Sequence, residues 1–276
     1  MIDLGKWNTL EVVRIEDRGV YLDGHESGEI LLPTFEGGKD QELGAWLKVF
    51  LYKDSEDRLI ATTKTPKIQV DEYALLNVTQ VNQVGAFLDW GLSKDLMLPF
   101  GEQKRRVSQG VSLVVRAYVD EETGRIAATT KLGRFLDKVE RRFLEDEQVD
   151  LLIVRRSTPG YNVIVEGTHW GMIYHDQIFQ PVSIGDKVKG YVLGTREDNK
   201  IDIILQKPGA EKVGTLAEQI MDKLQQGGGF ISVGDKSDAL EIQAMFGVSK
   251  KTYKKALGQL YRERKVLLEG GGVKLI

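Results

Sequence analysis

The chain contains no cysteine, and this absence excludes several kinds of site at once. Disulfides, thiolate zinc sites and cysteine nucleophiles all need a thiol. No stretch approaches the run of about 18 apolar residues that a membrane span requires, so we expect no membrane partner. Residues 1–20 carry seven charged side chains, which leaves no room for the apolar core of a signal peptide. We therefore expect a cytoplasmic protein of globular composition.

Signatures of catalysis and of cofactor binding are also missing. The glycines at 227–229 are not followed by Lys-Ser, so no phosphate loop of the Gly-x-x-x-x-Gly-Lys-Ser/Thr form is present, and no Gly-x-Ser-x-Gly motif occurs. His169 and His175 lie six residues apart, a spacing that fits neither a helical pair nor strand alternation beside a third obvious ligand. We predict a chain that is not an enzyme, with no cofactor and no metal site.

The formal net charge of −3 does not indicate a polyanion partner for the chain as a whole. The charge is nevertheless graded along the sequence. Residues 1–66 carry −5, residues 67–148 carry −1, residues 149–210 are neutral and residues 211–276 carry +3. Any contact with a phosphate backbone is therefore expected in the C-terminal half.

Internal repeats organise the sequence. RLIATTK at 58–64 returns as RIAATTK at 125–131, and GVYLD at 19–23 returns as GAFLD at 85–89, at offsets of 67 and 66. A weaker third copy keeps register at an offset of 75, with Gly160 in the place of the first glycine of GAFLD. Three copies of one structural unit are expected.

Each unit is expected to form five short strands, which in the second unit are 73–81, 85–90, 95–99, 111–119 and 125–130. Five strands in about 60 residues suit a small closed barrel of the OB type, although half of a β-sandwich would show the same periodicity. Apolar residues at helical spacing predict a linker helix at 132–147. The expected domains are OB-type barrels at 1–66, 67–148 and 149–210, and a different domain at 211–276.

Helical periodicity begins after residue 210. One helix is expected to end at the glycines 227–229, a second to be capped by Ser237 or Asp238, and a third to be capped by Ser249. A terminal hairpin over 265–276 completes a winged-helix pattern. The predicted fold class is therefore mainly β with a C-terminal α+β domain: three tandem five-stranded OB-type barrels followed by a winged helix.

The second and third units resemble the RNA-binding OB domain named after ribosomal protein S-one. The resemblance rests on VTQVNQVGAFLD at 78–89 with RIAAT at 125–129, and on GMIYHDQI at 171–178 with IGDKVKG at 184–190. In that family single-stranded RNA lies across strands two and three, on aromatic residues and a histidine. Each base stacked on an aromatic ring contributes about 1–3 kcal/mol.

The third barrel is expected to be the best RNA-binding barrel. The family's strand-three histidine position holds Pro33, Pro99 and Tyr174, and proline neither stacks nor donates as histidine does. Tyr21 and Phe87 occupy the strand-two aromatic position, where they could also simply fill the barrel cores. The barrel residues expected to contact RNA are Tyr161, Tyr174, Arg155, Arg156, Lys187, Lys189, Arg196 and Phe87.

A basic cluster lies in the third helix of the last domain. Residues 248–265 carry a local balance of +6, and four lysines at i, i+1, i+4 and i+5 share one face opposite Tyr253 and Leu257. Like charges repel by about 0.2–0.5 kcal/mol per i,i+4 pair, a cost that a polyanion would offset. A solvated basic face remains the alternative. The residues concerned are Lys250, Lys251, Lys254, Lys255, Arg262, Arg264 and Lys265.

The order of the four parts resembles the conserved virulence factor B family of bacterial proteins over essentially the whole chain. FGVSKK at 246–251 and KKALGQLY at 254–261 look like the C-terminal domain of that family. The resemblance implies an RNA-binding protein without known catalytic activity, linked to regulation of gene expression.

The leading hypothesis is a non-catalytic protein that binds single-stranded RNA through the third barrel and the winged helix. The first two barrels would then be a spacer or a protein-docking surface. Two alternatives stay open: a DNA-binding transcriptional regulator whose helix beginning at Ser249 enters a major groove, and a protein-docking scaffold. An RNA-processing hydrolase is not supported, because the sequence supplies no chemistry for it.

Overall fold

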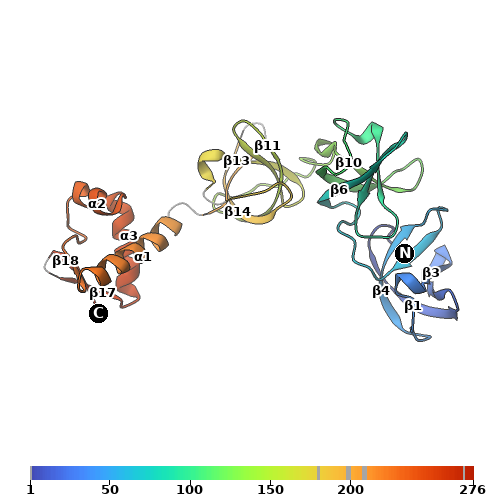
Figure 1. The fold of residues 1–276 in the computed structure, drawn as a ribbon, viewed down its shortest axis with the longest axis horizontal. Coiled ribbons are helices and arrows are strands. Elements are labelled where there is room, and N and C mark those ends of the chain that lie inside the picture. The colour runs from blue at the N-terminus through green and yellow to red at the C-terminus, as the bar shows by residue number, and fades with distance from the viewer. Residues whose placement is uncertain (1, 179–180, 197–199, 207–209, 270) are drawn as a thin grey trace. The chain divides into compact units, whose positions relative to one another are not determined.

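The computed structural model describes residues 2–178, 181–196, 200–206, 210–269 and 271–276, with the backbone alone for 210–215. It contains three closed five-stranded barrels, followed by three helices and a three-stranded sheet (Figure 1). The chain divides into two compact units, residues 1–203 and 204–276. No helix in the described ranges is long and apolar enough to cross a membrane.

The three barrels share one strand order. Barrel 1 consists of β1 (Trp7–Glu16), β2 (Gly19–Asp23), β3 (Glu29–Pro33), β4 (Trp46–Lys53) and β5 (Leu59–Thr62). Barrel 2 consists of β6 (Tyr73–Val81), β7 (Gly85–Asp89), β8 (Leu96–Pro99), β9 (Ser112–Val119) and β10 (Ile126–Thr129). Barrel 3 consists of β11 (Gln148–Arg156), β12 (Gly160–Val165), β13 (His169–Tyr174), β14 (Lys187–Thr195) and β15 (Ile201–Ile204). In each, the first strand pairs with the second and fourth, and the fifth pairs in parallel with the third. The predicted fold class is confirmed.

The repeated glycine at the start of each second strand has a steric cause. A Cβ atom at Gly19, Gly85 or Gly160 would lie only 1.9–2.5 Å from a carbonyl oxygen of the third strand. Any side chain would therefore push the second and third strands apart. The glycines pair with the last residue of the third strand, which is Pro33, Pro99 or Tyr174.

Apolar contacts join neighbouring barrels. Phe50 of β4 and Tyr52 meet the Trp90 ring edge-on, with ring centroids 5.8 and 6.2 Å away. On the other side of barrel 2, Leu136 is buried in one cluster with Ile164 of β12. These contacts connect barrel 1 to barrel 2 and barrel 2 to barrel 3.

The prediction of a linker helix at 132–147 is wrong. The only helical part of this segment is a single 3-10 turn, Leu132–Arg134. Asp137 has a φ of 59°, in the left-handed region, and its N–H donates to the carbonyl of Thr168 at 2.8 Å. Leu132, Leu136 and Phe143 are buried, the last against the ring of His169, whereas Val139 and Leu144 are exposed, so the segment buries only part of its apolar residues and does so without a helix.

The second unit contains the winged-helix elements in the predicted order. They are α1 (Ala210–Gln226), β16 (Phe230–Ile231), α2 (Ala239–Phe246), α3 (Lys250–Arg262), β17 (Val266–Glu269) and β18 (Gly272–Leu275). The Asp238 carboxylate accepts a hydrogen bond from the N–H of Leu240 at 2.8 Å and caps the N-terminus of α2. The Ser249 hydroxyl accepts one from the N–H of Thr252 at 3.3 Å and caps the N-terminus of α3. The strand β16 was not predicted, because two residues show no periodicity.

The core of the second unit surrounds Tyr253 of α3. Its ring is fully buried against Phe246, and its hydroxyl donates to the carbonyl of Val233 at 2.6 Å. Burial holds the pKa of this phenol far above its ordinary value. The opposite face of α3 therefore points to solvent.

Candidate nucleic-acid interface

The outer face of barrel 3 is set by the register between β12 and β13. Asn162 lies opposite Met172, and Tyr174 lies opposite Gly160. Cross-strand partners point to the same side of a sheet, so these residues share one face. Because Gly160 has no side chain, no cross-strand neighbour on β12 covers Tyr174, which is half-buried.

Tyr174 forms a flat cationic surface with Arg196. The guanidinium carbon lies 5.3 Å from the centre of the phenol ring. Nε and Nη2 of Arg196 both donate to Oδ1 of Asp202, at 2.8 and 2.7 Å, and this holds the guanidinium in place. The three side chains, with Thr195, line an open groove of about 420 Å³. A π face and a fixed positive charge lie together here, which suits a nucleotide.

Arg155 extends this face along β11. Its Nε donates to Oδ1 of Asn162 at 2.8 Å, and its guanidinium carbon lies 6.0 Å from the centre of the Trp170 ring. Arg155 and its neighbour Arg156 are exposed. The sequence expectation for Arg155, Arg196 and Tyr174 is thus compatible with their positions, whereas Arg156 lies opposite Tyr161, on the other side of the strand.

Tyr161 does not share a face with Tyr174. It lies opposite the buried core residue Ile173, so its side chain belongs to the inner side of the strand, at the end of the barrel. Its ring meets the ring of His175 edge-on at 5.9 Å. The position that corresponds to Tyr21 and Phe87, two residues after the glycine, holds Asn162 instead.

Lys187 and Lys189 line a different cleft, of about 610 Å³, between barrels 2 and 3. This cleft also contains the carboxylates of Asp71, Glu72, Asp150 and Glu166. Lys189 pairs with Asp150 at 2.8 Å, and this hydrogen bond raises the pKa of the lysine. The structure therefore places both lysines among acidic groups rather than beside the groove of Tyr174.

In barrel 1, the Tyr21 ring is covered by an arginine whose charge is compensated by carboxylates, so this pair offers no free positive charge to a phosphate. The guanidinium of Arg14 lies 3.6 Å from the centre of its ring, and Arg14 is itself paired with Glu16 and Glu29. Tyr21 is half-buried on the outer side of β2 rather than in the barrel core.

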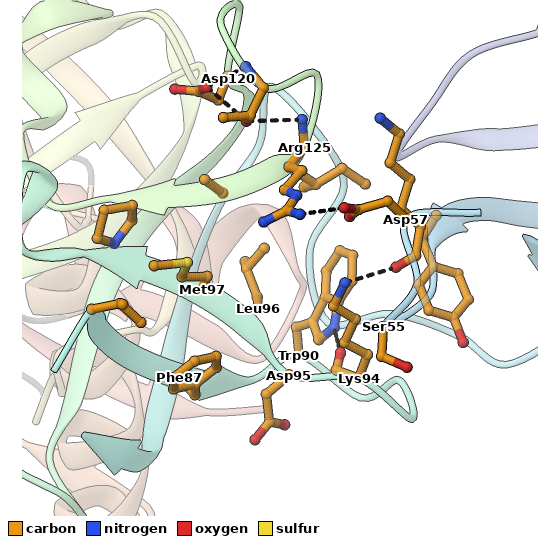
Figure 2. Close-up of a pocket in the computed structure, with 17 residues that line it drawn as sticks. Ser55, Asp57, Phe87, Trp90, Lys94, Asp95, Leu96, Met97, Asp120 and Arg125 are labelled. Atoms are coloured by element: carbon orange, nitrogen blue, oxygen red, sulfur yellow. Dashed lines mark hydrogen bonds and ion pairs between the residues drawn. The ribbon is translucent and has the colours of Figure 1, made fainter. Parts of the chain in front are cut away.

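In barrel 2, Phe87 and Met97 lie opposite each other on the outer side of β7 and β8. They line a cleft of about 520 Å³ between barrels 1 and 2, shown in Figure 2. Arg125 of barrel 2 is joined across the cleft to Asp57 of barrel 1. The Lys94 ammonium donates to the carbonyl of Asp54 at 2.6 Å, and burial lowers its pKa.

The basic face of α3 is exposed. Lys251, Lys254 and Lys255 point away from the core and have no ion pair within the described ranges, whereas Lys250 is half-buried. Beyond the helix, Lys265 pairs with Glu263 at 2.7 Å. Arg262 and Arg264 are exposed.

Sequence reasoning missed two features of this interface. Asp202, which orients Arg196, is a strand residue with no motif around it. The second is a pair in barrel 2, where the guanidinium of Arg106 lies 3.8 Å from the centre of the Phe100 ring. Three consecutive basic residues, 104–106, are the sequence signal that could have indicated this pair.

Comparison with known proteins gives two family matches. Residues 4–64, which contain barrel 1, match the S1 domain family, and residues 218–275 match the CvfB-like winged helix domain family. Both are domain types that bind nucleic acids.

Relatives align over nearly the whole chain. An uncharacterized protein, YitL, of Bacillus subtilis (strain 168) is 27% identical, over 97% of this chain and 92% of that protein. Conserved virulence factor B of Staphylococcus aureus (strain MSSA476) is 24% identical, over 99% and 94%. A crystal structure described as a multidomain protein with nucleic acid binding domains, from Streptococcus pneumoniae TIGR4, is 24% identical, covers 99% of this chain and 98% of that chain, and has a TM-score of 0.43. The winged-helix match and these relatives show that the chain is similar to conserved virulence factor B along nearly its whole length.

Proposed function

We propose that this protein is a non-catalytic RNA-binding protein that holds single-stranded RNA on barrel 3 and on the basic face of α3. The observation that carries the proposal is the groove in which Arg196, fixed by Asp202, lies against the Tyr174 ring. A stacked ring and guanidinium accept any base, and the charge attracts the phosphate that follows it. A role in post-transcriptional regulation follows from the family resemblance.

The shape of the face favours a single strand over a duplex. In the groove a flat group can stack on the face of the Tyr174 ring, and a base is available for such stacking only when it is not paired. The lysines of α3 suit phosphates better than base edges, because an ammonium is a point charge without the two-pronged geometry that reads guanine. Both features support contact without strict sequence preference.

The test is fluorescence anisotropy with the full chain over a salt series. The probes are an unstructured RNA of about 20 nucleotides, a single-stranded DNA of the same sequence, and its duplex. We expect the single-stranded RNA to bind most tightly, with log K falling against log salt by about 0.7 per phosphate contacted. Tighter binding of the duplex would favour a DNA-binding regulator. Absence of binding to all three at low salt would overturn the proposal and favour a docking scaffold.

A further inference from the structure

The loop that follows β8 of barrel 2 carries an unpaired positive charge. Lys104, Arg105 and Arg106 are consecutive and exposed, and none forms an ion pair within the described ranges. The other arginines of this barrel are different, since Arg116 and Arg125 pair with carboxylates. The positive charge of this loop is thus available to a ligand.

One of these residues is already arranged for stacking. The Arg106 guanidinium lies 3.8 Å from the centre of the half-buried Phe100 ring, a distance typical of a guanidinium lying over an aromatic face. Phe100 directly follows Pro99, the residue at the family's histidine position. A planar group that is absent at Pro99 is therefore present one residue later.

The base of the loop is firmly held. The buried side chain of Gln103 donates to the carbonyl of Leu98 at 3.1 Å, and the N–H of Lys104 donates to the hydroxyl of Thr130 at 2.7 Å. Glu102 forms two hydrogen bonds with Arg134, at 2.8 and 3.0 Å. These contacts place the loop at a defined site on the barrel.

The loop adjoins the cleft between barrels 1 and 2. Pro99 lines that cleft together with Phe87 and Met97, whose side chains lie along its barrel-2 side in Figure 2. Its volume of about 520 Å³ is within the range of about 300–1,000 Å³ usual for small-ligand sites, so a nucleobase fits. The Phe100 ring with Arg106 over it suits a base and its phosphate better than it suits an acidic peptide, which has no planar ring to place there.

We propose that barrel 2 contains a second contact site for single-stranded RNA, in which Phe100 and Arg106 stack with a base while Lys104 and Arg105 bind the neighbouring phosphates. This site rests on the proposed function, because it extends the path of the same RNA. It also replaces the expectation that barrel 2 acts as a spacer or a protein-docking surface.

The test uses the full chain in which Lys104, Arg105 and Arg106 are all replaced by Gln. The matched control replaces Lys39, Lys131 and Lys138 by Gln, since these are also exposed, unpaired within the described ranges and equal in charge. In anisotropy titrations with single-stranded RNA, the loop variant should lower the slope of log K against log salt by about 0.7 for each phosphate that it no longer binds. The control should leave the slope unchanged.

Two single variants test the stacking itself. Phe100→Leu keeps an apolar side chain, and Arg106→Lys keeps the charge, so both variants should fold. Each lacks one of the two flat groups, the Phe100 ring or the Arg106 guanidinium, on which a base would stack. Loss of one stacked base predicts about a 5- to 150-fold weaker affinity for Phe100→Leu. Ultraviolet crosslinking of the native chain to the same RNA, mapped by mass spectrometry, should label the segment 97–104.

The outcomes separate this inference from the proposed function. If the native chain binds RNA but both the loop variant and Phe100→Leu bind as well as it does, and crosslinks fall only after residue 148, the barrel-2 site is wrong and the proposed function stands. If the loop variant and the charge-matched control weaken binding equally, the effect is general electrostatics and the site is also wrong. If the native chain binds no RNA, both proposals fail. Preferential capture of an acidic peptide over RNA would reassign the loop to protein contact.

Discussion

Glu36 is the buried charge on which the joint between barrels 1 and 2 depends. Its side chain is 0% exposed, and its carboxylate accepts hydrogen bonds from Thr62 at 2.5 Å, from Lys64 at 3.1 Å, and from Ser93 of barrel 2. Burial alone would raise its pKa, but these three donors outweigh burial and hold the pKa below its ordinary value.

Replacing Glu36 by Ala should destabilise this joint. The buried hydroxyl of Thr62 loses a charged acceptor, which costs about 1.5–3 kcal/mol, and Ser93, which reaches water, loses less. Lys64 is almost half exposed and regains water, so its ion pair adds at most about 1 kcal/mol. We expect a total of about 2–4 kcal/mol, which corresponds to a fall in Tm of about 5–15 °C for a unit of this size.

The assay is differential scanning calorimetry of the full chain, with Glu121→Ala, an exposed glutamate of barrel 2, as control. The pH dependence gives a second readout. A carboxyl group whose folded pKa is lowered stabilises the fold above its unfolded pKa of about 4.3, and this contribution is lost as pH falls through the folded pKa. The difference between the native chain and Glu36→Ala should therefore be full at pH 7 and shrink below about pH 4. If Glu36→Ala has the same Tm as the native chain at pH 7, the reasoning is refuted.

Two further predictions concern the binding face and the fold that presents it. Replacing the exposed α3 lysines Lys251, Lys254 and Lys255 by Gln should lower the salt slope of RNA binding by about 0.7 for each phosphate released, and an unchanged slope would show that this face is only solvated. Gly160→Ala places a Cβ atom 1.9 Å from the carbonyl oxygen of Ile173, so barrel 3 should unfold at lower urea concentration than in the native chain. Gly194→Ala, in the same barrel with open space around it and no positive φ, should cost less.

The architecture was predictable because the same local rule recurs in every barrel. A glycine that must lie against a strand-three carbonyl begins each second strand, and it leaves a repeat in the sequence that can be aligned without knowing the fold. The helix caps Asp238 and Ser249 were predictable in the same way, since a side-chain acceptor directly before a helical pattern is typical of a helix N-terminus.

The sequence-based predictions failed where contacts between segments that are distant along the chain decide the local structure. The segment 132–147 has apolar residues at helical spacing, yet Asp137 and Phe143 are held by barrel 3. Tyr161 is one residue away from the binding face, and sequence alone did not fix that register. Lys189 looked basic in sequence but lies beside Asp150, which is 39 residues away along the chain.

The central claim is that RNA stacks on the Tyr174 ring of barrel 3. The most direct measurement compares the affinity of the full chain for single-stranded RNA with that of Tyr174→Ala and of Tyr21→Ala. Tyr21 is the control because this barrel-1 tyrosine is already covered by Arg14. We predict about 5- to 150-fold weaker binding for Tyr174→Ala, from the loss of about 1–3 kcal/mol of stacking, and native affinity for Tyr21→Ala. Native affinity for Tyr174→Ala, with an intact fold, would contradict the account.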